Sequence, residues 1–130
     1  MSKSLTPYYF YILGTVLCTV YGQLILKWRI GKFGQLPEGV TNKIVFLLNL
    51  IIDPYIFSGL FAAFIASFFW MAAVTRLDLS SAYPLITAGL TTLTVVLAIV
   101  LFKEPLTITK ATGILMIVGG VVLVLRDVGT

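Results

Sequence analysis

The sequence is poor in charged residues and contains no histidine. Of its 130 residues, nine are Lys or Arg and five are Asp or Glu, so 11% are charged, whereas soluble domains usually carry about 25%. Without histidine, the chain lacks the commonest metal ligand and the usual proton switch near neutral pH. Cys18 is the only cysteine, so no internal disulfide can form. We therefore expect neither a soluble catalytic domain nor a metal or cofactor site, and we predict that the protein is not an enzyme.

Long apolar runs take the place of the missing charges. Three runs without a charged residue and a shorter fourth run cover residues 8–26, 55–75, 79–102 and 111–125. A helix needs roughly 20 apolar residues to cross the hydrocarbon core of a bilayer. We predict a single all-α membrane domain over residues 1–130, with transmembrane helices at about residues 8–28, 54–76, 80–102 and 107–126. The fourth helix reaches full length if the Lys110 side chain extends toward the headgroups.

The segments between these helices are short. Residues 29–42 contain three glycines and a proline, which predicts a loop. Residues 43–52 are apolar but too few to span a bilayer, so this segment lies at the interface, re-enters the membrane or extends the next helix. Asp53 followed by Pro54 is typical of a helix start.

The basic residues indicate how the chain is oriented. Four spans place both termini on one side of the membrane, together with Lys3, Arg76 and Arg126. The remaining six basic residues fall on the other side: Lys27, Arg29, Lys32, Lys43, Lys103 and Lys110. The positive-inside rule favours this second side as cytoplasmic. The net charge of +4 therefore reflects topology and contact with anionic lipid, not nucleic-acid binding.

Two of the predicted helices carry a line of polar residues. Their members recur at spacings of three or four and so share one face: Tyr11, Thr15, Thr19, Gln23 and Lys27 in the first helix, and Ser80, Tyr83, Thr87, Thr91 and Thr94 in the third. A threonine can be satisfied by a carbonyl of its own helix, but an amide in lipid needs a partner. We expect Gln23 to face other helices or a wet cavity. Lys27 is either a topology marker or a cation that holds an anion at the mouth of a polar groove.

Three further features have two readings each. Gly113 and Gly120 are seven residues apart in the fourth helix and form either a dimerisation face or an internal packing face. Glu104 is either a locally paired interfacial charge or a residue that orients the basic cluster. Trp70 and Tyr83 either stack on a ligand or pack as ordinary buried rings.

An ordered set of short motifs resembles a known family. It consists of Gly22-Gln23-Leu24 with Lys27, then Trp70, Ala82-Tyr83-Pro84-Leu85, Glu104-Pro105, and the string from Gly113 to Val121. The sequence is similar to the small four-helix branch of the drug/metabolite transporter superfamily, related to small multidrug resistance and EamA-like proteins, and most similar to undecaprenyl-phosphate aminoarabinose flippase subunits. The resemblance implies a four-helix bundle that works as a dimer, with itself or with a similar small protein, in the cytoplasmic (inner) membrane.

The sequence departs from the multidrug branch in one respect. Members of that branch resemble one another in having a glutamate within the first helix, whereas residues 8–26 contain no acid. A groove lined by Gln23 and Lys27 suits an anionic substrate. The sequence therefore predicts a flippase, or a flippase subunit, for a polyprenyl-phosphate-linked sugar. The expected substrate-binding residues are Gln23, Lys27, Arg29, Trp70, Tyr83, Thr87, Thr91, Lys103 and Glu104. The alternatives are a small multidrug or guanidinium-type cation exporter, and a non-transporting membrane subunit of a sugar-lipid modification system.

Overall fold

All regular elements in the described part of the chain are helices. The structure, a computed structural model, describes residues 6–128. The helices are α1 (Thr6–Phe33), α2 (Val40–Ile52), α3 (Pro54–Ala73), α4 (Leu79–Phe102) and α5 (Ile108–Val128). Four of them, all except α2, are long and apolar enough to cross a membrane. This confirms the predicted all-α membrane fold.

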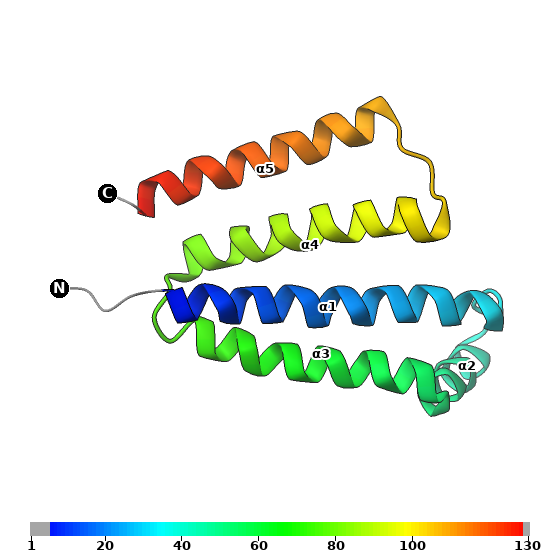
Figure 1. The fold of residues 1–130 in the computed structure, drawn as a ribbon. Coiled ribbons are helices and arrows are strands. Elements are labelled where there is room, and N and C mark those ends of the chain that lie inside the picture. Colours follow the sequence, from blue (N-terminus) through cyan, green and yellow to red (C-terminus); the bar gives the residue numbers. More distant parts are fainter. Residues whose placement is uncertain (1–5, 129–130) are drawn as a thin grey trace.

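The four long helices lie side by side in a row, in the order α3, α1, α4, α5 (Figure 1). The start of α1, the end of α5 and the α3–α4 link lie at one end of the row, and α2 and the α4–α5 link lie at the other. The buried apolar core joins α1 to α4 and to the α3–α4 link. It consists of Ile12, Val16, Val20, Ala73, Leu77, Ala82 and Ile86.

Glycines bring α1 and α3 into close contact. A Cβ placed on Gly22 would lie 2.8 Å from the carbonyl oxygen of Gly59, and one on Gly59 would lie 2.5 Å from Cγ2 of Ile25. Small residues at such a crossing let two helix backbones approach closely, which is how helices gain packing energy in lipid. Beside this crossing the Tyr21 and Ser58 hydroxyls are hydrogen-bonded at 3.1 Å. The α1–α3 pair is therefore the tightest part of the fold.

The segment predicted as a loop is largely helical. Helix α1 continues to Phe33, five residues beyond the predicted end, and stops where Gly34 takes a φ of +93°. The apolar segment 43–52 belongs to a separate helix, α2, whose Leu50 is buried and which packs against α3. The predicted start of the next helix is confirmed, since the Asp53 carboxylate accepts a hydrogen bond of 3.2 Å from the Ile56 N–H.

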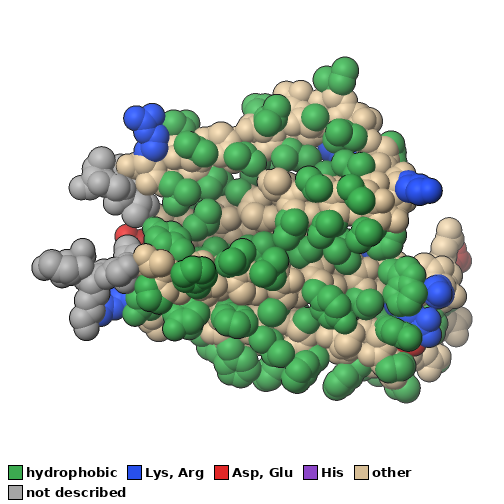
Figure 2. Space-filling model, in the orientation of Figure 1, with side chains coloured by type: hydrophobic (Ala, Val, Ile, Leu, Met, Phe, Trp, Pro, Cys, Tyr) green, Lys and Arg blue, Asp and Glu red, His purple; other side chains and the backbone are tan. Residues whose placement is uncertain are grey.

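The surface of the row is apolar between two charged ends. Along α3, four phenylalanines recur on the outward face with 53–59% exposure: Phe57, Phe61, Phe64 and Phe68. Helix α5 is the least buried span, with Leu115 and Met116 each 72% exposed. Figure 2 shows basic side chains at both ends and apolar side chains between them. Such a surface is stable only against lipid or protein, so the chain is a multi-pass membrane protein.

Candidate functional site

The polar line of α1 faces a groove between its two neighbours. Thr15 and Thr19 of α1, Ser67 and Trp70 of α3, and Tyr83 of α4 line a hollow of about 250 Å³, which we call the central groove. The rings of Trp70 and Tyr83 meet edge to face, with centroids 6.1 Å apart. The two predicted aromatic residues thus lie together on the wall of one groove.

Several hydroxyl groups along these helices bond to their own backbone. Thr15 donates to the Tyr11 carbonyl at 2.9 Å, Ser67 to Phe64 at 2.6 Å, and Thr87 to Tyr83 at 2.9 Å. These bonds use the hydroxyl proton and leave the oxygen free to accept. The groove wall is therefore mildly polar without requiring a bound partner.

The Gln23 side chain, in contrast, makes its hydrogen bond to a different helix. Its side-chain oxygen accepts a hydrogen bond of 3.0 Å from the Thr94 hydroxyl of α4. The Gln23 residue is otherwise exposed. Thr94 belongs to the polar line of α4 but was not among the predicted site residues, although its position three residues beyond Thr91 was the available signal.

Charged groups meet one helical turn further along α1. The Lys27 ammonium lies 3.9 Å from Oε1 of Glu104, with the two side chains 67% and 38% exposed. Lys103, beside Glu104, is also exposed and ends α4 in the left-handed conformation, with φ 56°. Three of the predicted site residues thus gather at the end of the row that carries α2.

A second hollow opens between α4 and α5 at the same end. It has a volume of about 380 Å³ and is lined on its polar side by Thr91, Thr94, Glu104 and Lys110; we call it the α4–α5 cleft. The Lys110 ammonium donates to the Pro105 carbonyl at 3.1 Å. From the sequence, Lys110 was expected to reach the headgroups and to mark the topology, because nothing in the linear pattern relates it to Thr91.

Arg29 is not part of this gathering. It lies two positions beyond Lys27 and so projects from a different side of α1. Its guanidinium makes two hydrogen bonds of 3.0 Å to Asp53 and lies 4.8 Å from the centroid of the Tyr55 ring. The hydrogen bond from Arg29, helped by that from the Ile56 N–H, lowers the pKa of Asp53 against the opposing effect of burial. This pair ties the end of α1 to the start of α3.

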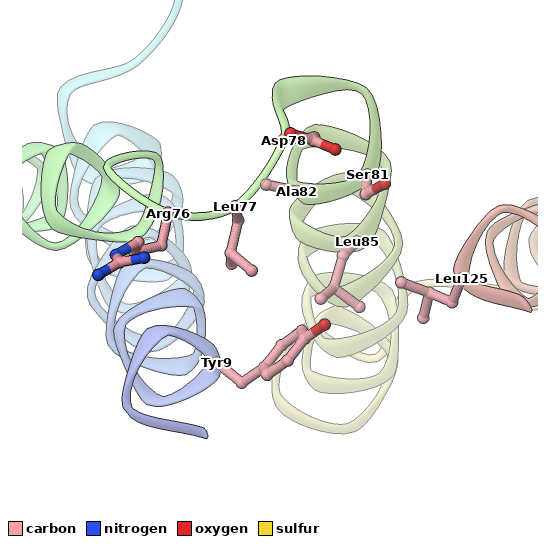
Figure 3. A pocket seen from close by; sticks show the side chains of 8 residues that line it. All are labelled: Tyr9, Arg76, Leu77, Asp78, Ser81, Ala82, Leu85 and Leu125. Carbon is pink, nitrogen blue, oxygen red and sulfur yellow. The ribbon is translucent and has the colours of Figure 1, made fainter. Parts of the chain in front are cut away.

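The opposite end of the row holds an open hollow of about 780 Å³, lined by Trp70, Leu79, Ser80, Tyr83 and Pro84, and a small pocket. Figure 3 shows the small pocket between Tyr9, the α3–α4 link, Leu85 and Leu125, with the Arg76 side chain directed away from it. Its volume of about 80 Å³ is well below the roughly 300–1,000 Å³ that is typical of small-molecule pockets. The two predicted dimer-interface glycines, Gly113 and Gly120, lie on α5 with open space where a Cβ would stand.

Comparison with known proteins gives a consistent picture. The EamA-like transporter family matches residues 1–126. A probable 4-amino-4-deoxy-L-arabinose-phosphoundecaprenol flippase subunit ArnF of Aeromonas hydrophila is 34% identical over 125 residues, covering 95% of this chain and 82% of that protein. The ArnF subunit of Shewanella sediminis is 33% identical, with 85% and 82% covered. An ArnE subunit of Pseudomonas fluorescens is 32% identical over 55% of this chain and 61% of its own length. No solved structure gives a significant match.

Proposed function

We propose, because this chain belongs to the EamA-like transporter family, that it is a flippase subunit which moves a polyprenyl-phosphate-linked sugar across the cytoplasmic membrane. The observation that carries the proposal is the hydrogen bond between Gln23 and Thr94. One helical turn further along α1, the Lys27 ammonium lies beside Glu104 at the end of this polar line. An uncharged polar path that ends at a cation suits a neutral or weakly charged sugar attached to a phosphate.

The proposed roles follow the two hollows. The prenyl tail stays in the bilayer beside the row, while the phosphate binds the Lys27 ammonium with help from the exposed Lys103. The sugar passes Gln23 and Thr91, and the central groove with Trp70 and Tyr83 receives it nearer the other end. Thr87 sits on the same polar line of α4. Arg29 was expected at the phosphate, but its bonds to Asp53 support a role in holding α1 to α3 instead.

The charge of the spans supports an anionic cargo. None of the stretches Thr6–Phe33, Pro54–Ala73, Leu79–Phe102 and Ile108–Arg126 contains an acidic residue. A cation exporter needs an embedded carboxylate to hold its cargo and exchange protons, so quaternary ammonium compounds are poor candidates.

The proposed working unit is a dimer, with a second copy or with a similar small protein. A flat row of four helices leaves its grooves open along one side, and transporters generally build their path from two related halves. Helix α5 forms one edge of the row and exposes its apolar face, and Gly120 leaves room for close approach by a partner helix, whereas Gly113 lines the α4–α5 cleft. The six basic residues at the α2 end favour that end as cytoplasmic.

A binding measurement tests the proposal. The purified chain in nanodiscs is titrated with polyprenyl phosphate sugars, and binding is followed by the fluorescence of Trp28 and Trp70. We expect Lys27→Ala to weaken binding by about tenfold, which corresponds to one lost charge-assisted contact. Lys43→Ala is the matched control, since Lys43 lies on α2 away from both hollows. Equal binding by wild type and Lys27→Ala would remove Lys27 from the site, and no binding by the wild type would overturn the substrate class.

A further inference from the structure

A weak ion pair lies at the end of the row that carries α2. Lys27 and Glu104 are 3.9 Å apart and both partly exposed, and exposed ion pairs of this kind contribute little stability. The pair formed by Arg29 and Asp53 at the same end differs in every respect: it is 3.0 Å long, with side chains only 26% and 6% exposed. A ligand can therefore separate Lys27 from Glu104 at a small cost in free energy, whereas the shorter and more buried pair of Arg29 and Asp53 is harder to separate.

Glu104 is the acidic residue that lies between Lys27 and the α4–α5 cleft. It lines the α4–α5 cleft with Thr94 and Lys110, and on its other side it meets Lys27 of α1. Thr94 in turn bonds to Gln23, so the surface around the carboxylate also holds the Lys27 and Lys110 ammonium groups and a side-chain amide. The other described acids at this end do not reach this surface: Glu38 lies in the α1–α2 loop, and Asp53 is occupied by Arg29.

The arrangement discriminates between headgroups by their charge pattern. A phosphate that draws Lys27 away from Glu104 leaves the carboxylate unpaired beside another anion, and like charges at short range repel. A headgroup that carries both a phosphate and an amine gives each protein charge a new partner. One weak ion pair is then replaced by two charge-assisted contacts.

We propose that Glu104 binds the amino group of an aminated sugar while Lys27 holds the phosphate of the same lipid, which makes Glu104 the residue that selects aminated over neutral sugars. This inference rests on the proposed function, since it assigns a sugar class to the same groove. The selection follows the general rule that a site built to pair a polar group rejects the analogue that lacks it.

The test compares two lipids that differ only in the amine. The probes are 4-amino-4-deoxy-L-arabinosyl phosphoundecaprenol and its 4-hydroxy counterpart, titrated against the full chain in nanodiscs. We expect the wild type to prefer the aminated lipid by about tenfold. Glu104→Gln should abolish this preference by weakening the aminated lipid alone, and Glu104→Asp, which keeps the charge, should retain part of it.

The controls separate selection from a structural role. Glu38→Gln removes a carboxylate on the same side of the membrane but away from the α4–α5 cleft. This variant should keep the full preference for the aminated lipid. Far-UV circular dichroism checks that each variant keeps its helix content. Equal loss of both lipids in Glu104→Gln would overturn the inference, as would an unchanged preference. A wild type that binds both lipids equally would overturn the inference and leave the proposed function standing, whereas a wild type that binds neither would overturn both.

Discussion

The side-chain oxygen of Gln23 accepts a hydrogen bond of 3.0 Å from the hydroxyl of Thr94, 71 residues away in the sequence. This bond joins the polar lines of α1 and α4 at one point. It decides whether these lines form a path between helices or two unrelated sets of self-satisfied hydroxyls.

Removing either partner of this bond should disturb both packing and transport. Interhelical hydrogen bonds in membranes contribute about 0.6 kcal/mol on average, so a double-mutant cycle of Gln23→Leu and Thr94→Val should give a coupling of about that size. Stability is measured by titration with a denaturing detergent, and translocation by reconstitution in vesicles. Thr75→Val is the control, because Thr75 lies in the α3–α4 link at the other end of the row and its hydroxyl donates to the Ala72 carbonyl. Full translocation by Gln23→Leu would contradict the proposed path.

The close approach of α1 to α3 should not tolerate a methyl group. Gly59→Ala places a Cβ 2.5 Å from Ile25, and overpacking of this kind typically costs about 1–3 kcal/mol. Gly31→Ala is the matched control in α1, because no atom lies within 4 Å of its added Cβ. The control should be neutral or stabilising by up to about 1 kcal/mol, since alanine favours helix. Equal stability of the two variants would show that the crossing is looser than described.

The pair formed by Arg29 and Asp53 should make stability depend on pH. Because the pKa of Asp53 is lowered in the folded protein, the pair contributes fully above the ordinary value of 3.8 and loses its contribution as pH falls below it. Asp53→Asn keeps a capping side chain but removes the charge. We expect the wild type to melt at a higher temperature than this variant at pH 7, and the difference to shrink below about pH 4. A difference that is constant with pH would contradict the role of the pair.

The exposed glycine of α5 offers a test of the proposed dimer. Gly120→Leu fills space that is open in the single chain, so it should leave the helix content unchanged and reduce both the dimer fraction and translocation. Cross-linking in membranes measures the dimer fraction. Leu115→Phe enlarges a residue that is already 72% exposed on another side of α5 and serves as the control. If Gly120→Leu keeps a normal dimer fraction, the interface lies elsewhere.

Cysteine labelling can determine the topology, because Cys18 is the only native cysteine in the sequence. In a Cys18→Ser background, Glu38→Cys and Asp78→Cys place one thiol in the α1–α2 loop and one in the α3–α4 link, at opposite ends of the row. A membrane-impermeant maleimide added to intact cells should label Asp78→Cys and spare Glu38→Cys, because the basic end is expected inside. Labelling of both would indicate that the chain inserts in two orientations.

The sequence-based predictions succeeded where the signal is local. Charge-free runs of about 20 residues predict spans because the bilayer sets the length, and Asp53 followed by Pro54 predicts a helix start because the cap acts within three residues. The end of α1 was placed too early, since Gly31 resembles a breaker but lies within a helix that runs to Phe33 and whose Arg29 is paired with Asp53. That pair joins residues 24 positions apart, which no local pattern encodes.

The sequence by itself determined the solvent of this protein and the number of its spans, because hydropathy and charge can be read along the chain without knowledge of its fold. Only the tertiary structure decided which polar residues work together. It joined Gln23 to Thr94, set Glu104 between α1 and the α4–α5 cleft, and withdrew Arg29 from the groove. The reason is geometric: a helical repeat assigns each residue to a face, but which neighbour that face meets depends on how the helices are arranged in the row.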